Sequence, residues 1–178
     1  MPVFLFLIIG MIVAASIAFI VAIFSFTIWS DLKGAPFVKS RKDRIETMLE
    51  LAEIKPGTRV LELGSGDATL LIAAAQRGAY AQGVEINPLL AWYSRKKIKR
   101  AGMEKQIRIV RQNFYECSLA ETKPDAVFLY LLPGTLKKLR EKLYAELPPG
   151  TRIISNAFRI EGLIPVAQEN NVYAYHLS

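Results

Sequence analysis

The sequence predicts an α/β protein with a Rossmann-like, doubly wound and mostly parallel sheet, a C-terminal antiparallel hairpin and one transmembrane helix before them. Short hydrophobic runs alternate with helical patterns along the domain, and a glycine-rich break follows the first run. The N-terminus differs in composition, since residues 1–30 contain no charged side chain. We therefore expect a transmembrane anchor at 1–30, a basic linker and N-terminal helix over the ligand site at 31–57, and a ligand-binding domain at 58–178.

The apolar stretch over residues 3–29 is long enough to cross a bilayer. It spans roughly 40 Å as a helix, against about 30 Å of hydrocarbon. A cleaved signal peptide is the alternative, but the stretch is long for one and lacks a basic n-region. Basic residues crowd only the downstream side, so the positive-inside rule predicts a single-pass membrane protein with its N-terminus outside and its domain in the cytoplasm. These basic residues are Lys33, Lys39, Arg41, Lys42 and Arg44.

The elements of the domain follow from hydrophobic periodicity and its breaks. Ser40 is the expected N-cap of a helix that ends near residue 54, before Pro56 and Gly57. Asn87 and Pro88 open another helix as N-cap and first residue. The predicted strands are 59–63, 81–86, 107–110, 125–130 and 151–158; the predicted helices are 40–54, 67–77, 88–100 and 135–147; and a hairpin joins 164–168 to 172–177.

Two strand ends carry residues that are typical of a nucleoside site. The motifs are Glu62-Leu-Gly-Ser-Gly-Asp67 and Gly83-Val-Glu-Ile-Asn-Pro88. Because the carboxyl ends of parallel strands meet at one edge of a sheet, we expect these motifs to lie together. Gly64 and Gly66 allow a sharp turn and a close approach to a ligand, while Glu85 can accept hydrogen bonds from two ribose hydroxyls.

The residues around the glycines favour S-adenosylmethionine over a dinucleotide. A dinucleotide fingerprint has a third glycine or alanine where this chain has Thr69, and it places pyrophosphate at the helix N-terminus. Asp67 and Glu62 would repel a phosphate there, but they suit a ligand with a sulfonium and an ammonium group. A loop whose glycines only turn the chain and whose acids only cap the next helix is the structural alternative.

The charge and composition of the chain limit its possible binding partners. The net charge of +7 lies entirely after residue 30, and beside a membrane anchor it favours an anionic lipid surface over nucleic acid as the partner. The run Arg95-Lys-Lys-Ile-Lys-Arg100 either faces that surface or is a solvated helix face. With one cysteine, Cys117, and one histidine, His176, we expect no disulfide and no metal site.

The combined motifs resemble the class I, seven-β-strand S-adenosylmethionine-dependent methyltransferases. More narrowly, the chain resembles a prokaryotic-type member of a membrane-anchored protein-lysine methyltransferase family whose mitochondrial members modify the ATP synthase c subunit and the adenine nucleotide translocase. Three positions depart from that family's pattern: Lys39-Ser40 replaces Pro-Thr, Ala68 replaces Gly, and Asn113 replaces an Asp. The further motifs that carry the resemblance are Gly34-Ala-Pro-Phe-Val-Lys-Ser40, Trp92-Tyr-Ser-Arg95, Tyr130-Leu-Leu-Pro133, Leu147-Pro-Pro-Gly150 and Ser155-Asn156.

The resemblance implies an enzyme that methylates a lysine of a membrane protein near the cytoplasmic interface, and it implies roles for individual residues. Tyr130 and Asn156 are the expected catalytic residues, and Phe37 is expected to cover the cofactor. Simple packing is the alternative for Tyr130 and for Phe37. The implied cofactor contacts are Glu62, Gly64, Gly66 and Asp67 at the methionine end, Glu85 at the ribose, Asn113 and Phe114 at the adenine, and in addition Phe37, Ser65 and Ile86.

Two other functions fit the same cofactor residues. One is a methyltransferase that acts on a lipid or a small membrane metabolite. The other is a cofactor-binding membrane module without catalysis.

Overall fold

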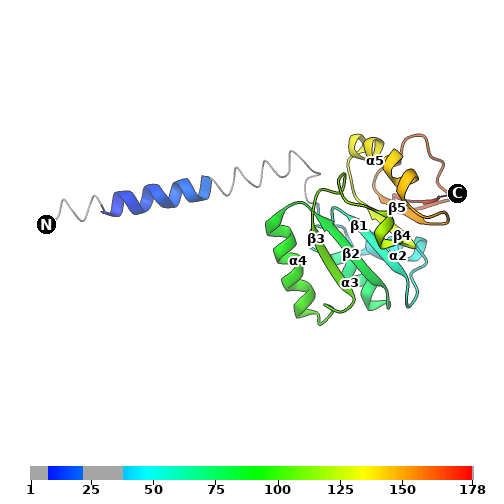
Figure 1. The fold of residues 1–178 in the computed structure, drawn as a ribbon, viewed down its shortest axis with the longest axis horizontal. Coiled ribbons are helices and arrows are strands. Elements are labelled where there is room, and N and C mark those ends of the chain that lie inside the picture. The colour runs from blue at the N-terminus through cyan, green and yellow to red at the C-terminus, as the bar shows by residue number, and fades with distance from the viewer. Residues whose placement is uncertain (1–7, 22–37, 178) are drawn as a thin grey trace. The chain divides into compact units, whose positions relative to one another are not determined.

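The computed structural model describes residues 8–21 and 38–177, and the chain divides into two compact units, 1–36 and 37–178. In the first unit, residues 8–21 form a helix (Figure 1). The rest of the predicted membrane anchor lies outside the described residues. Within the described ranges, no helix combines the length and the apolar character that crossing a membrane requires.

The second unit is built on a seven-stranded sheet with the order β3-β2-β1-β4-β5-β7-β6. The strands from β1 to β5 are parallel, whereas β7 runs antiparallel to both of its neighbours. This arrangement confirms the predicted mostly parallel sheet with an antiparallel C-terminal hairpin. The strands are β1 (Arg59–Leu63), β2 (Tyr80–Glu85), β3 (Ile107–Arg111), β4 (Ala126–Leu129), β5 (Arg152–Asn156), β6 (Ala167–Glu169) and β7 (Val172–His176).

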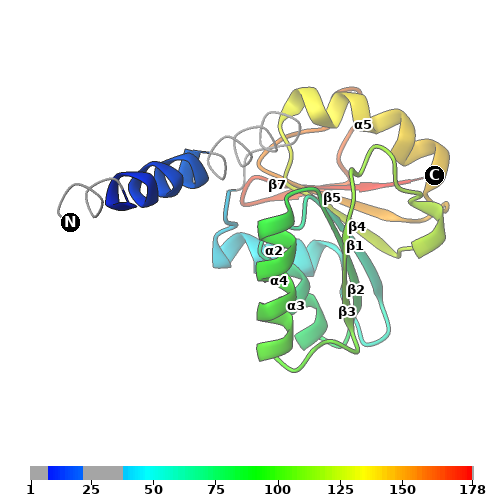
Figure 2. The same cartoon turned by 60° about the vertical axis from the view of Figure 1, so that its left-hand side comes forward.

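Helices cover both faces of the sheet, as Figure 2 shows: α2 (Lys42–Leu51), α3 (Thr69–Gln76) and α4 (Pro88–Arg100) form one layer, and α5 (Pro133–Glu146) lies on the other side. Because side chains alternate along a strand, Val60 faces the first layer and Leu61 faces the second, and both are buried. The β3–β4 connection contains only the short 3-10 helix η1 (Ala120–Thr122). Tyr80 and Arg108 on the outer strands are accordingly exposed.

Local signals explain most of the element boundaries. Asn87 caps α4 as predicted, since its Oδ1 accepts hydrogen bonds from the backbone N–H groups of Leu89 at 2.9 Å and Leu90 at 3.3 Å. The predicted N-cap of α2 is wrong. The helix begins after Arg41 without a side-chain cap, and the Ser40 hydroxyl instead accepts a hydrogen bond from Asn156.

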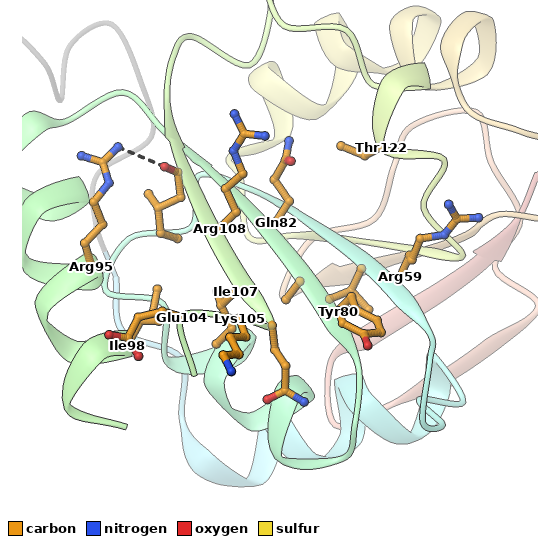
Figure 3. A pocket seen from close by; sticks show the side chains of 14 residues that line it. Arg59, Tyr80, Gln82, Arg95, Ile98, Glu104, Lys105, Ile107, Arg108 and Thr122 are labelled. Atoms are coloured by element: carbon orange, nitrogen blue, oxygen red, sulfur yellow. Dashed lines mark hydrogen bonds between the residues drawn. The ribbon is translucent and has the colours of Figure 1, made fainter. Parts of the chain in front are cut away.

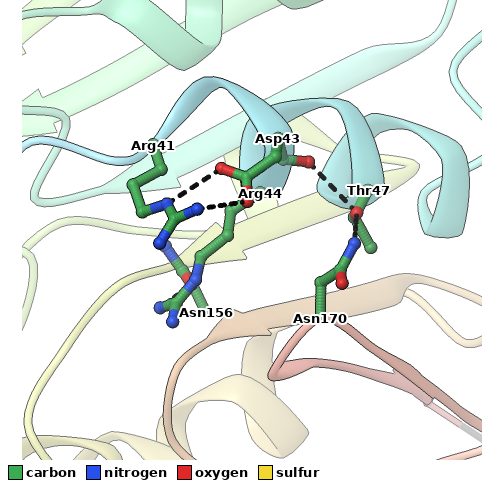
Figure 4. A network of polar contacts seen from close by, with 6 residues as sticks. All are labelled: Arg41, Asp43, Arg44, Thr47, Asn156 and Asn170. Atoms are coloured by element: carbon green, nitrogen blue, oxygen red, sulfur yellow. Dashed lines mark hydrogen bonds and ion pairs between the residues drawn. The ribbon is translucent and has the colours of Figure 1, made fainter.

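The C-terminal hairpin turns through two asparagines in the left-handed region. Asn170 and Asn171 have φ values of 48° and 58°, the pattern of a type I′ turn, which suits the twist of two antiparallel strands. The Asn170 amide donates a hydrogen bond of 2.9 Å to the Thr47 hydroxyl on α2 (Figure 4). The turn therefore connects the end of the chain to the first helix of the domain.

Gly83 in β2 lets the glycine-rich loop pack against the sheet. A Cβ at this position would lie 2.5 Å from Ser65 Oγ and 2.7 Å from Leu71 Cδ1, distances that real side chains do not adopt. Gly134 in α5 offers a matched comparison, because a Cβ there would meet nothing within 4 Å.

We expect Gly83→Ala to lower the free energy of unfolding by about 1–3 kcal/mol, because the loop or Leu71 must shift to admit the methyl group. Gly134→Ala should be neutral or stabilise by up to about 1 kcal/mol, since alanine suits a helix better than glycine. Urea unfolding of both variants measures the difference. Equal stabilities for the two variants would contradict the close packing at Gly83.

Candidate cofactor and active site

The loop between β1 and α3 is fixed against the end of β2. The backbone N–H groups of Gly64 and Ser65 both donate to the Val84 carbonyl, at 2.8 and 3.0 Å. Gly64 and Gly66 have φ values of 78° and 52°, which a residue with a Cβ adopts only at a cost. The structure thus brings the two predicted strand-end motifs together at the carboxyl edge of the sheet.

Glu85 joins this loop to the start of α4. Its Oε2 accepts a hydrogen bond of 2.8 Å from Gly66 N, and its Oε1 accepts one of 2.7 Å from Asn87 N. The side chain is only 6 % exposed. Its carboxylate is therefore fixed in orientation beside the glycine loop, and the predicted ribose contact stays a prediction. Ile86 follows directly and is partly buried.

Glu62 and Ser65 contribute two shielded oxygens to the site. Neither Oε2 of Glu62 nor Oγ of Ser65 has a hydrogen-bond partner among the described residues, although both atoms are out of contact with solvent. Burial raises the pKa of Glu62 well above its ordinary value, and the negative charges of Asp67 and Glu85 raise it further. Ser65 Oγ packs against Gly83 of β2. Buried polar atoms without partners are costly, so Oε2 of Glu62 is better explained by a polar ligand than by packing.

Asp67 forms an ion pair that the sequence did not suggest. Its Oδ2 lies 2.8 Å from Lys97 Nζ in α4, and its Oδ1 accepts hydrogen bonds from the Thr69 hydroxyl and backbone. Burial alone would raise the pKa of Asp67, but the hydrogen bonds from Lys97 and Thr69 outweigh it and leave the pKa below its ordinary value. The ion pair connects the glycine loop to α4.

Lys97 and Ala68 were not among the predicted site residues. Lys97 belongs to a basic run that is typical of a solvated face, and only the phase of the helix places this one lysine against the loop. Ala68 stands where the related family has glycine, and its φ of 59° is indeed in the left-handed region that glycine favours. Its side chain is fully buried.

Asn113 and Phe114 follow β3, beside the end of β2. The Asn113 side chain accepts a hydrogen bond from Tyr115 N at 3.1 Å and donates one to Glu116 at 3.0 Å, so it shapes the turn after the strand. Phe114 is buried, and its ring centroid lies 4.7 Å from that of Tyr115. The location is consistent with an adenine site, and the contact itself stays a prediction.

The two expected catalytic residues differ in exposure. Tyr130 directly follows β4 at the carboxyl edge and is half-buried. Asn156 ends β5 and is fully buried, with its Oδ1 accepting a hydrogen bond of 3.3 Å from Arg44 on α2 (Figure 4). The amide therefore holds α2 against the sheet in this structure, and a catalytic role for Asn156 stays a prediction. Phe37 lies outside the described residues.

A hollow of about 630 Å³ lies elsewhere, along the outer strands of the sheet (Figure 3). Arg59, Tyr80, Gln82 and Arg108 from β1, β2 and β3 contribute to its lining. None of the described residues that were predicted to contact the cofactor lines it. This hollow is therefore separate from the carboxyl edge that carries the glycine loop.

The features at the carboxyl edge fit S-adenosylmethionine. Glu62, Asp67 and Glu85 place three carboxyl groups around one loop, which favours a cation and disfavours phosphate. Oε2 of Glu62 also lacks a hydrogen-bond partner among the described residues. The strand order includes an antiparallel β7, and a glycine-rich loop follows β1. Fold and site together define an S-adenosylmethionine-dependent methyltransferase.

Comparison with known proteins then gives the family. The ANTKMT methyltransferase domain matches residues 62–167, and the chain belongs to this family. The adenine nucleotide translocase lysine N-methyltransferase of Mus musculus is 36% identical over 133 residues, which make up 74% of this chain and 57% of that protein. A protein-lysine N-methyltransferase of Saccharolobus islandicus is 34% identical over 138 residues, 76% of this chain and 84% of that protein. The chain therefore matches little more than half of the mouse relative and most of the Saccharolobus relative.

Solved structures agree on fold and cofactor. An RNA methyltransferase from Salinibacter ruber, crystallised with S-adenosyl-L-homocysteine, has a TM-score of 0.75 and 33% identity, over 79% of this chain and 94% of that chain. A SAM-dependent methyltransferase from Geobacter sulfurreducens, also with S-adenosyl-L-homocysteine, has a TM-score of 0.58 at 20% identity, over 65% of this chain and 47% of that chain, and supports the fold alone. The predicted class and the predicted cofactor, S-adenosylmethionine, are confirmed.

We expect Glu62→Gln to uncouple cofactor binding from pH. In the free protein Glu62 keeps its proton above the range of an ordinary glutamate because its pKa is raised, and a cationic ligand beside it would displace that proton. Wild-type affinity for S-adenosylmethionine should therefore rise with pH until Glu62 ionises, whereas the variant should bind more weakly and almost independently of pH. Calorimetry in buffers of different ionisation enthalpy should detect proton release for the wild type alone.

The stability of the cofactor-free protein should depend on the same carboxyl group. A raised folded-state pKa contributes stability that is fully present below the unfolded-state pKa and is lost as pH rises through the folded-state pKa. The Glu62→Gln variant should therefore be more stable than the wild type at pH values above the raised folded-state pKa of Glu62, as measured by thermal unfolding across a pH series. A variant that loses stability at every pH would contradict the raised pKa.

We expect Lys97→Met to weaken S-adenosylmethionine binding although Lys97 is not a predicted cofactor contact, because Asp67 would be left half-buried without its cation. A double-mutant cycle with Asp67→Asn should give a coupling energy of about 1–3 kcal/mol for cofactor binding. Lys99→Met, two residues further on the same helix and exposed, is the matched control and should leave binding unchanged. Additive effects of Lys97→Met and Asp67→Asn would show that the ion pair does not position the loop.

Proposed function

We propose that this methyltransferase transfers a methyl group to a lysine side chain of a membrane-associated protein on the cytoplasmic side. The observation that carries the proposal is sequence identity with protein-lysine N-methyltransferases, above all the 34% identity across 84% of the Saccharolobus islandicus protein. Relatives named as lysine N-methyltransferases of the adenine nucleotide translocase and of an ATP synthase component support a lysine acceptor as well. These two relatives match over 57% and 56% of their own lengths.

The N-terminal sequence supports a target at the membrane. Residues 1–30 carry no charge, and the residues that follow are rich in lysine and arginine. A single-pass anchor with its N-terminus outside would hold the domain within a short tether of the cytoplasmic face. Such tethering raises the effective concentration of lysines near the bilayer and lowers that of soluble ones.

The main obstacle for the acceptor is its proton. A lysine with a pKa of about 10.4 is neutral roughly once in 2,500 molecules at pH 7, which costs about 4.6 kcal/mol. Removing the ammonium group from water lowers its pKa, so a half-buried aromatic wall such as Tyr130 assists without a dedicated base. The Tyr130 hydroxyl would also orient the neutral amine by accepting a hydrogen bond from it.

S-adenosylmethionine supplies an electrophilic methyl group on a positively charged sulfur. Glu62 and Asp67 would hold its charged methionine end, and Glu85 its ribose, at the edge beside Tyr130. The lysine ammonium first loses a proton to solvent. The lone pair of the neutral amine then forms the new C–N bond as the C–S bond breaks, the sulfur keeps that bond's electron pair as a neutral thioether, and the product forms directly as a methylammonium. Much of the rate would come from holding the amine in line.

We expect purified wild-type protein, added with labelled S-adenosylmethionine to membranes from cells that lack it, to label a protein on lysine. Tyr130→Ala should lower this transfer by about 10- to 100-fold through lost positioning, while cofactor affinity changes little. Tyr144→Ala is the matched control, because Tyr144 is an exposed tyrosine on α5. Acid hydrolysis of the labelled band identifies methyl-lysine.

Other destinations of the label would overturn the proposal. Label in the organic phase would favour a lipid or small metabolite as acceptor, and label in RNA would favour the type of acceptor of the Salinibacter ruber RNA methyltransferase. Cofactor binding without label in any fraction would favour a non-catalytic module.

A further inference from the structure

The positive charge of this chain is concentrated at one edge of the sheet. Residues 92–111, which cover most of α4 and all of β3, contain eight basic residues and one acidic residue, a net charge of +7. This equals the net charge of the whole chain, because the remaining residues contain 15 basic and 15 acidic side chains. The β3 strand is the edge strand of the sheet. Seven of the eight basic side chains are exposed and Lys97 is partly buried, so most of the charge faces solvent. Two of these basic residues, Arg108 in β3 and Lys105 just before it, line the hollow along the outer strands (Figure 3).

One face of α4 combines this charge with exposed apolar side chains. At 3.6 residues per turn, Leu89, Trp92, Tyr93, Lys96, Lys99 and Arg100 fall within about 120° of the helix surface, and we refer to these six residues as the α4 stripe. Leu89, Trp92 and Tyr93 are 50%, 55% and 46% exposed. The Lys96 ammonium lies 4.0 Å from the centre of the Trp92 ring. Apolar side chains thus occupy the first half of the stripe and cations the second.

The basic residues that flank the stripe have structural partners. Arg95 donates a hydrogen bond of 3.0 Å to the Ile109 carbonyl of β3, and Lys97 pairs with Asp67 on the opposite flank. Ala91, Ser94 and Ile98 form the buried face. By contrast, Lys99 and Arg100 have no ion-pair or hydrogen-bond partner among the described residues. Packing within the domain therefore does not explain the stripe.

We propose that the α4 stripe docks on the headgroup layer of an anionic phospholipid membrane. Tryptophan, tyrosine and leucine beside lysine and arginine are the side chains that partition into the bilayer interface, where the rings sit at the headgroup level and the cations meet lipid phosphates. An acidic protein surface would explain the cations but not three exposed apolar side chains at the start of the same stripe. The inference rests on the proposed membrane location and adds a second attachment point to it.

The docking would fix the direction in which the active site faces. Leu89 lies in the first turn of α4, whose N-cap Asn87 is held by the carboxylate of Glu85. The apolar half of the stripe is therefore next to the carboxyl edge where the methyl group is transferred. Docking through it would bring that edge to the depth of the headgroups, which selects lysines just outside the hydrocarbon.

Fluorescence of Trp92 in the full-length chain tests this inference. The sequence has two tryptophans, so Trp29→Phe leaves Trp92 as the single probe. The protein is reconstituted in vesicles of brominated phosphatidylcholine, with and without anionic phosphatidylglycerol. We expect quenching of Trp92 in the anionic vesicles and its loss in about 1 M NaCl, where charges are screened beyond roughly 3 Å. Charge reversal by Lys96→Glu, Lys99→Glu and Arg100→Glu together should also abolish it.

A charge-matched control changes three exposed lysines elsewhere: Lys55→Glu, Lys123→Glu and Lys138→Glu should retain the quenching. Both triple variants should bind S-adenosylmethionine as the parent does, which shows that they are folded. The docking would be overturned if Trp92 were not quenched in the anionic vesicles. It would also be overturned if quenching were as strong in neutral vesicles, or as strong for the stripe variant, as for the parent in anionic vesicles. A change in Trp92 fluorescence on adding RNA, which anionic vesicles do not reverse, would overturn the docking as well and would favour a nucleic-acid surface. Quenching of Trp92 without methyl transfer to lysine would instead contradict the proposed function and would still support the docking.

Discussion

The electrostatics of one short loop determine how the rest of this domain is arranged. Glu62, Asp67 and Glu85 converge on the turn between β1 and α3, where burial makes their mutual repulsion strong. Burial and that repulsion raise the pKa of Glu62, the ion pair with Lys97 compensates the charge of Asp67, and two backbone N–H groups fix Glu85. Each of these solutions uses a different element of the fold. A cationic ligand lowers the remaining repulsion, so the same carboxyl groups that cost stability on folding contribute affinity on binding.

Residues whose roles are set by neighbours in sequence could be predicted, and those set by distant contacts could not. The boundaries of β1, the Asn87 cap and the two-asparagine hairpin turn all follow from signals within a few residues. Lys97 lies 30 residues from Asp67, and the basic run around it does not reveal which lysine faces inward. Asn156 bonds to Arg44 from 112 residues away. Ser40 is a good local N-cap that tertiary structure redirects to Asn156.

The α4 helix connects the cofactor loop to the outer surface of the domain. Its buried face packs on the sheet, one flank holds Asp67 through Lys97, and the other reaches β3 through Arg95. A rigid helix that carries both a site residue and a surface stripe transmits a displacement from one to the other. If the α4 stripe docks on a membrane as proposed, α4 is a physical route by which that docking affects the order of the glycine loop.

The position of β7 has a consequence for synthesis. The strand follows every other strand of this sheet in sequence, yet it lies inside the sheet between β5 and β6, and it also packs against α2. Translation must therefore add about 120 residues after α2 before the helix gains its full packing, which takes roughly 6–25 s at 5–20 residues per second. Throughout that interval Ile45, Met48 and Leu49, which are buried in the finished domain, are not fully covered. A nascent chain that lacks β7 therefore exposes apolar surface that the folded domain covers, and such surface favours aggregation.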